Sequence, residues 1–292
     1  MNRRKKKLTT AQKWMQGFIS IAGNIAPVAT VNFLVRQMFT LKTRPLKPAH
    51  VACINKAEKF SFDVPEFQNP ERKLKLSCYS WGAGTKTVLL MHGWDARAID
   101  FYKLIPVLVD SGYRVVSFDS PGHGHSEGEI SHIIDFKEVL HKFILHYGKP
   151  YAIVGHSMGG AAAAFMLMEY DIKIEKLVII AIPVVSKRFF DQMFSSMKVP
   201  MKMQKAFYAG YERELGESIE KYNLIERKET IKADNIFMIY DEFDEIAASE
   251  DVQEFLLDHP KIKTLNMKGV GHYSIIKDKH VISAITKFLH HA

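Results

Sequence analysis

One short run constrains this chain more than any other feature: Gly155-His156-Ser157-Met158-Gly159, a serine held between glycines. The apolar run 151–154 precedes it, and the strongly helix-forming run 161–168 follows it. This pattern predicts a strand, a sharp turn and a helix, with Ser157 on the turn. Such a turn imposes strained backbone angles on the serine, so its neighbours must lack bulky side chains.

A serine in this position is a candidate nucleophile. Its Oγ stands at the carboxyl end of a strand, and the N–H of Met158 points from the start of a helix towards a developing negative charge. A serine hydroxyl reacts poorly near neutral pH unless a base lies within hydrogen-bond reach and an acid orients that base. The sequence must therefore supply a histidine and a carboxylate, which follow such a turn in the order acid, then base.

His272 is the candidate base. The predicted strand 262–267 leads into Gly269-Val270-Gly271-His272, and the last helix follows this run. A histidine between glycine and the last helix is well placed to reach the turn at Ser157. Five other histidines lack such a context, and we expect them to be surface or core residues: His50, His259, His280, His290 and His291.

Asp244 is the favoured acid, because it lies a short turn beyond the apolar, β-rich run 235–240. Asp241, at the edge of that strand, is the alternative. Glu242 and Glu245 in the same loop are expected to be solvated.

The loop after the predicted strand 87–91 reads His92-Gly93-Trp94. Gly93 allows the backbone to approach a substrate closely, so the N–H groups of Trp94 and Met158 are predicted to form an oxyanion hole. We interpret His92 as a structural histidine, hydrogen-bonded under the loop, rather than as a second base.

These motifs, with the run Asp119-Ser120-Pro121-Gly122-His123-Gly124-His125-Ser126, resemble those of α/β-hydrolase-fold serine hydrolases over about residues 58–291. The resemblance implies an α/β fold: a mostly parallel central sheet flanked by helices, with a small helical cap inserted before the acid-bearing strand. It also implies that Asp119, Gly122 and Gly124 shape the pocket floor without doing chemistry. Serine at position 157, where dehalogenases and epoxide hydrolases carry aspartate, argues against those branches. The loop at residue 93 is neither H-G-G-G nor H-G-G-P-G, and the general likeness is to monoglyceride-lipase-like and related small esterases.

The alternation of strands and helical segments begins near residue 58 and predicts βαβ units with a parallel sheet. The expected strands are 59–64 and 74–81, as an antiparallel pair, then 87–91, 114–119, 151–155, 176–182, 235–240 and 262–267. The expected helices include 99–111, 131–147 and 158–170.

The predicted cap, about 184–230, is rich in methionine and aromatic residues. Phe189, Met193 and Met197 share a helical face there. They are expected to pack the cap core, to line an adaptable apolar substrate pocket, or to do both.

Basic charge is concentrated at the N-terminus. Residues 1–57 hold 11 of the 40 Lys and Arg and none of the 32 Asp and Glu, so the remainder is mildly acidic despite a total net charge of +8. We therefore divide the chain into a basic N-terminal helical segment with a linker (1–57) and a hydrolase domain (58–292). The body lacks the interleaved aromatic and basic residues of a nucleic-acid surface, and no nucleic-acid partner is expected.

Residues 14–41 are apolar with helical spacing, and Pro27 should break or kink the helix. Three interpretations stay open for this segment: a helical pair packed on the body, an amphipathic segment on an anionic membrane (residues 1–41), or a signal peptide or anchor. The run 43–48 is expected to be a linker. The predicted location is cytoplasmic, with membrane association through the N-terminal segment as the open addition.

Two cysteines, Cys53 and Cys78, show no metal-ligand spacing and are expected to be free thiols. Without a phosphate-binding loop or dinucleotide fingerprint, no cofactor and no metal are predicted. The sequence thus predicts a serine hydrolase that cleaves carboxylic esters of small molecules, with an apolar acyl group, through Ser157, His272 and Asp244. The same triad can serve thioesters, lactones, amides or C–C bonds. The alternatives outside catalysis are a hydrolase-fold binding protein and a membrane-recruited protein.

Overall fold

The structure, a computed structural model, describes residues 17, 21–23, 25–31, 33, 40–41, 44–227 and 230–290. The chain forms two compact units. The larger unit comprises residues 40–184 and 224–292, and the smaller comprises 185–223 together with residues 1–39.

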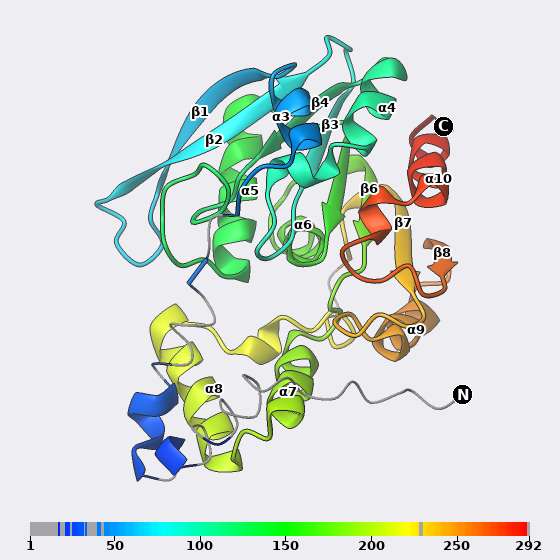
Figure 1. Cartoon of the computed structure of the whole chain (residues 1–292). Helices are drawn as coiled ribbons and strands as arrows, with labels where there is room; N and C mark the ends of the chain where they lie inside the picture. The colour runs from blue at the N-terminus through cyan, green and yellow to red at the C-terminus, as the bar shows by residue number, and fades with distance from the viewer. Residues whose placement is uncertain are drawn as a thin grey trace. The chain divides into compact units, whose positions relative to one another are not determined.

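An eight-stranded sheet forms the centre of the larger unit (Figure 1). The first two strand pairings are antiparallel and the other five are parallel, which confirms the predicted fold class. Predicted strand ends differ from the observed ends by two residues at most. In spatial order the strands are β1 (Glu58–Pro65), β2 (Lys73–Trp81), β4 (Arg114–Phe118), β3 (Thr87–Met91), β5 (Ala152–His156), β6 (Ile174–Ile180), β7 (Ala233–Asp241) and β8 (Lys263–Met267).

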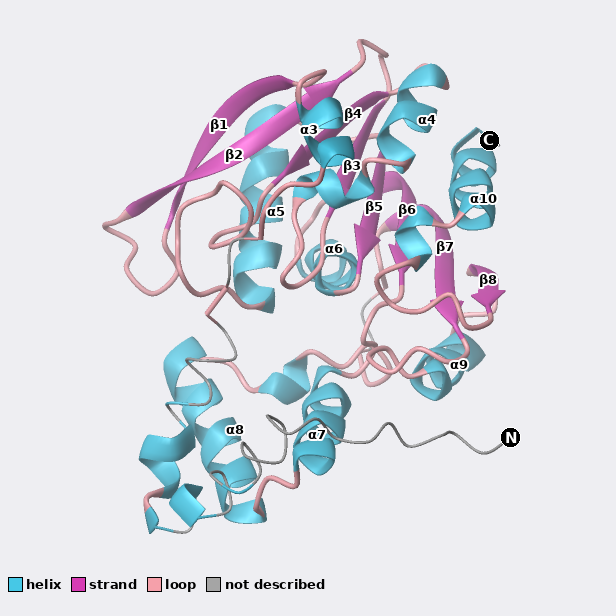
Figure 2. Cartoon of the chain, in the orientation of Figure 1, coloured by secondary structure: helices cyan, strands magenta, loops and turns pink. Residues whose placement is uncertain are grey.

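Helices flank this sheet, which is why its central strands are largely apolar (Figure 2). Every residue of β5 is buried. One core cluster joins the strands to α3 (Pro48–Ile54), α4 (Leu104–Asp110) and α10 (Lys279–His290). The remaining helices of this unit are α5 (Ile133–Tyr147) and α6 (Met158–Glu169), which pack on one another, and α9 (Ser249–Asp258).

Two local features differ from the sequence predictions. The helix expected over 99–111 is divided into a 3-10 turn, η1 (Ala98–Phe101), and α4. Helix α3 begins where the linker was expected to end, with Pro48 in its first turn. A seven-residue helix has little stability of its own, so tertiary contacts must hold it. Here Trp81 Nε1 donates a hydrogen bond to the carbonyl of Cys53 (2.9 Å), and Ile54 joins the core.

The insertion between β6 and β7 is helical, as predicted. It consists of α7 (Ser186–Met197), α8 (Met201–Leu215) and the 3-10 turn η2 (Ile219–Lys221). Phe190, Phe194 and Phe207 form its aromatic core, with the Phe207 ring centroid 5.2 Å and 5.0 Å from the other two. Part of the methionine and aromatic content therefore packs the insertion itself.

The described residues between 17 and 33 belong to this smaller unit. A helical run covers 27–31, Ala26 before Pro27 is not helical, and Gly23 lies against the Met203 side chain. Ile21, Ile25 and Val28 form an exposed apolar face. Across the described residues, no helix combines the length and the apolar character that crossing a membrane requires.

The close approach of α6 to β3 generates a stability prediction. A Cβ on Gly159 would lie 2.2 Å from the carbonyl oxygen of His92, whereas a Cβ on Gly210 in α8 would meet nothing closer than 3.8 Å. Gly159→Ala should lower the free energy of unfolding by about 1–3 kcal/mol through overpacking. Gly210→Ala, the matched helical control, should not lower it. Urea denaturation followed by circular dichroism measures both variants, and equal effects would contradict the packing argument.

Candidate active site

Ser157 occupies the turn between β5 and α6 with backbone angles φ 51° and ψ −125°. A non-glycine residue rarely adopts such a positive φ. The turn is possible because strand and helix approach closely at glycines. A Cβ on Gly155 would lie 2.4 Å from the Cα of Gly160. The predicted strand, sharp turn and helix are therefore all present.

The structure brings Ser157, His272 and Asp244 together from three separate loops. Ser157 Oγ lies 3.0 Å from His272 Nε2, and His272 Nδ1 lies 2.8 Å from Asp244 Oδ2. The other carboxylate oxygen of Asp244 accepts the backbone N–H groups of Ile246 (2.8 Å) and Ala247 (3.0 Å). Each of the three side chains belongs to a residue that is 7% exposed, so little water competes for these hydrogen bonds.

Asp241, the alternative acid, has a different environment. Its carboxylate accepts the backbone N–H groups of Phe243, Gly269, Val270 and Gly271. Burial opposes its ionisation, but these four donors together hold the pKa of Asp241 below its ordinary value. Asp241 thus ties the loop after β7 to the loop that carries His272. Of the two glutamates expected to be solvated, Glu245 is exposed and Glu242 pairs with Lys268 (3.0 Å).

The loop after β3 lies beside the turn at Ser157, because Met91 and Gly155 are register partners in adjacent parallel strands. A Cβ on Gly93 would lie 2.9 Å from the Cβ of Ser157. His92 donates from Nδ1 to the Gly93 carbonyl (2.8 Å) and accepts the Ser120 N–H at Nε2 (2.9 Å). Burial lowers the pKa of His92, and it serves as the structural histidine that the sequence indicated.

The contacts of the Asp119–Ser126 segment also hold neighbouring loops together. Asp119 is buried and accepts the N–H groups of Ala98 (2.8 Å) and His125 (3.0 Å) and the hydroxyl of Tyr79 (3.2 Å). These bonds join the loop after β4 to η1 and β2. They fit the loop-shaping role that the resemblance implied for Asp119.

His156 is a site residue that the sequence reasoning did not identify. Its Nε2 donates to the carbonyl oxygen of His272 (2.9 Å), and the two ring centroids are 4.9 Å apart. Burial, with the neighbouring His272, lowers the pKa of His156 to about 3, so its ring is neutral near pH 7. The residue before the nucleophile thus holds the backbone of the candidate base. The G-x-S-x-G pattern leaves this position unspecified and carried no signal for it.

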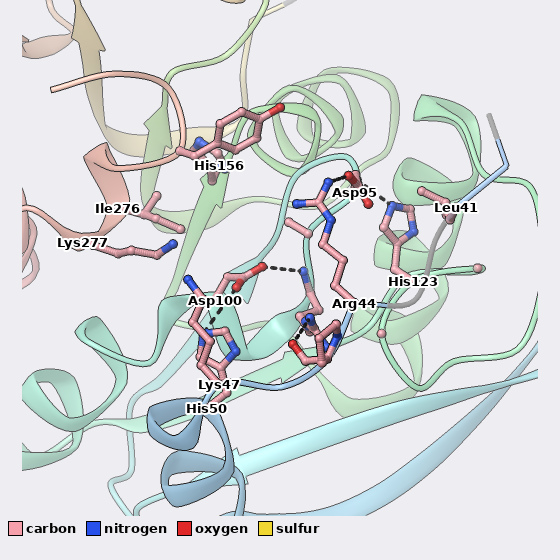
Figure 3. Close-up of a pocket in the computed structure, with 16 residues that line it drawn as sticks. Leu41, Arg44, Lys47, His50, Asp95, Asp100, His123, His156, Ile276 and Lys277 are labelled. Carbon is pink, nitrogen blue, oxygen red and sulfur yellow. Dashed lines mark hydrogen bonds and ion pairs between the residues drawn. The ribbon is translucent and has the colours of Figure 1, made fainter. Parts of the chain in front are cut away.

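The sequence analysis also did not predict a cavity of about 540 Å³. It lies in the larger unit, and its lining includes His156 and Tyr273, the residues next to Ser157 and His272 (Figure 3). The predicted pocket residues Phe189, Met193 and Met197 lie half-buried on α7 of the smaller unit, and their place in a substrate pocket stays a prediction.

Both cysteines, Cys53 and Cys78, are free thiols, as expected. Burial, with the nearby Asp119, raises the pKa of the Cys78 thiol to about 12, so this thiol is unreactive at neutral pH. Over the described ranges, His, Cys, Asp and Glu side chains form no group of three or more that could hold a metal ion.

The environment of Asp241 generates a pH prediction. A carboxylate whose pKa is lowered on folding stabilises the protein above its unfolded pKa of about 3.9, and this contribution is lost as the pH falls through the folded value. Asp241→Asn removes the charge and one acceptor oxygen, so it should lower the stability at pH 7 and flatten its decline below about pH 4. Urea titrations of both proteins from pH 7 to about pH 3 measure the difference. Parallel stability curves would contradict it.

Comparisons with known proteins agree with this architecture. Residues 86–229 match the family model of the alpha/beta hydrolase fold. A zebrafish (Danio rerio) serine hydrolase-like protein is 26% identical over 75% of this chain and 68% of its own length. Human monoglyceride lipase is 29% identical over 37% of this chain, but the match spans only 39% of the lipase. The solved esterase Pf2001 of Pyrococcus furiosus superposes with a TM-score of 0.59 at 20% identity, covering 85% of this chain and 96% of the esterase.

These matches, together with the eight-stranded sheet and the helices that flank it, lead to one classification. The chain is an α/β-hydrolase-fold hydrolase.

Proposed function

We propose that this protein is a serine hydrolase that cleaves carboxylic esters through an acyl-enzyme. The observation that carries the proposal is the continuous hydrogen-bonded chain from Ser157 through His272 to Asp244, with links of 3.0 Å and 2.8 Å. This is the geometry that an activated serine needs: a base within reach of the hydroxyl and an acid on the far side of the base.

In the first step, Ser157 Oγ attacks the ester carbonyl carbon while His272 Nε2 takes the hydroxyl proton. Asp244 fixes the tautomer with hydrogen on Nδ1 and stabilises the imidazolium that forms. The carbonyl oxygen becomes an oxyanion, and we assign its stabilisation to the N–H groups of Trp94 and Met158. The proximity of Gly93 to Ser157 supports this assignment, because the Trp94 N–H belongs to the peptide that follows Gly93.

Collapse of the tetrahedral intermediate expels the alcohol, which takes its proton from His272. Water then attacks the acyl-enzyme, with His272 acting as base again, and the acid leaves as Ser157 regains its proton. The hydrogen bond from His156 to the His272 carbonyl holds the backbone of the base in position through both steps.

Esters are favoured as substrates because relatives and structural neighbours bear the names monoglyceride lipase and esterase. The methionine and aromatic side chains of the insertion, including Phe189, Met193 and Met197, support an apolar acyl group. The second candidate, the same triad acting on thioesters or C–C bonds, is favoured by two matches. One is the thioesterase domain of the curacin pathway, and the other is a 2-hydroxy-6-oxononadienedioate hydrolase of Paraburkholderia phymatum.

Replacing Ser157 by Ala should abolish labelling by a fluorophosphonate probe and lower kcat/KM for p-nitrophenyl butyrate by at least about 10³-fold. Asp244→Asn should lower kcat by about 10²–10⁴-fold, because the base loses its correct tautomer. Ser274 is an exposed serine two residues after His272. Ser274→Ala is the matched control and should keep both the probe labelling and the ester turnover.

Labelling that persists in Ser157→Ala would refute the nucleophile. A folded wild-type protein that neither labels nor turns over esters would favour the binding-protein alternative. A series of p-nitrophenyl esters of increasing chain length, together with thioester analogues, then ranks the substrate classes.

We further propose that the protein is cytoplasmic and contacts anionic membranes through its N-terminal segment. The exposed face of Ile21, Ile25 and Val28 follows a basic run at residues 3–7, which is the composition of an interfacial helix. The free thiols of Cys53 and Cys78 fit a reducing compartment.

A flotation assay with phosphatidylserine vesicles tests the membrane contact. Wild type should float with the vesicles, and replacing Ile21, Ile25 and Val28 together by Glu should leave the protein in the soluble fraction. Leu257→Glu changes an equally exposed apolar side chain on α9 and should not alter flotation. A wild-type protein that stays soluble contradicts the proposal.

A further inference from the structure

The 540 Å³ cavity of the larger unit has a charged lining, which also includes His156, the residue before Ser157 (Figure 3). Its walls come from residues 44–50, 95–100, 122–124 and 273–277, together with Leu41 and His156. A volume of this size suits a small organic ligand. His156 precedes Ser157 and Tyr273 follows His272 in the chain, so the lining reaches the two loops that carry the candidate nucleophile and base.

Positive charge dominates the lining. Four cationic side chains, Arg44, Lys47, Arg97 and Lys277, face two carboxylates, Asp95 and Asp100. Both carboxylates already have partners. Asp95 pairs with the Arg44 guanidinium, and Asp100 accepts the backbone N–H of Arg97 (3.1 Å).

The Arg97 guanidinium donates to the carbonyl of Pro45 (3.4 Å), so the two lysines are the cations available to a ligand. In the part of the chain that the structure describes, neither Lys47 nor Lys277 forms an ion pair with a carboxylate. Lys277 is half-buried and Lys47 is exposed. Figure 3 shows both side chains at the end of the cavity where His50 and Asp100 lie.

His50 lies at the same end of the cavity as the two lysines. It is buried, and neither ring nitrogen has a hydrogen-bond partner within the described structure; Nε2 lies 3.8 Å from Asp100 Oδ1. Burial is the main cause that lowers the pKa of His50. Asp100 opposes the shift, and Arg97, Lys47 and Lys277 add to it. The three cations therefore act together on the same point, despite the neighbouring carboxylate.

We propose that this cavity binds a carboxylate carried by the substrate, so that the enzyme cleaves esters with an anionic end remote from the scissile bond. The inference rests on the proposed ester hydrolysis, since it places the scissile bond at Ser157. Lys47 and Lys277 supply charge-assisted hydrogen bonds to the carboxylate. The anionic group thus sets substrate choice, while the apolar part of the ester occupies other space.

Two esters that differ by one charge test the proposal. Monomethyl glutarate carries a free carboxylate and dimethyl glutarate does not. Titration calorimetry on Ser157→Ala measures their binding without turnover. The monoester should bind at least about 5-fold tighter, and this ratio should shrink as salt rises to about 0.3 M because screening weakens the attraction.

Lysine variants in the Ser157→Ala background locate the effect. Replacing Lys47 and Lys277 together by Gln should bring the monoester-to-diester ratio close to one. Replacing Lys56 and Lys279 by Gln removes the same charge at exposed positions outside the cavity lining and should keep the ratio. Succinate and adipate monoesters should show one preferred chain length, set by the distance from Ser157 to the lysines.

Equal binding of the two glutarate esters, no binding of either at millimolar concentration, or the same loss in both double variants would overturn the proposal. These outcomes are separable from failure of the proposed function. Absence of fluorophosphonate labelling in wild type refutes the catalytic serine, whereas the calorimetric ratio depends on the lysines alone.

Discussion

The strained turn at Ser157 is the constraint on which the rest of the site depends. A positive φ at a serine persists only where the surrounding structure fixes it, and here the fixing contacts are backbone against backbone. Gly155 and Gly160 let β5 and α6 cross within contact distance, and Gly93 lets the neighbouring loop reach the serine. A side chain at these glycines would push the turn at Ser157 away from His272 and from the loop after β3.

The partners of Ser157 reach it because parallel strands end at one edge of the sheet. β3, β5, β7 and β8 each deliver a loop to that edge, and hydrogen bonds then fix the loops to one another. Asp241 holds the His272 loop through backbone N–H groups, while His156 holds the carbonyl of His272. Asp241 and His156 therefore have different tasks, set by what each one contacts.

The proposed catalytic residues and the proposed binding cavity differ in their charge. The proposed triad of Ser157, His272 and Asp244 is buried and includes one carboxylate, while Asp241 is occupied by backbone donors. The cavity instead gathers four cations against two carboxylates. An ester with an apolar portion and a carboxylate would use both regions, the first for reaction and the second for orientation. The fold itself does not dictate this division, because a hydrolase fold can host many substrates.

The sequence by itself determined the sheet, the turn at Ser157 and the candidate residues, because each depends on a local pattern: apolar runs, glycine at close approaches, and polar residues directly after strands. It favoured Asp244 over Asp241 without separating them, since both follow β7 and only the hydrogen bonds made at a distance distinguish the two. Helix α3, the His156 contact and the charged cavity were decided by tertiary structure alone. Each joins segments far apart in the chain, such as Cys53 with Trp81 and Lys47 with Lys277, and no local periodicity records such pairings.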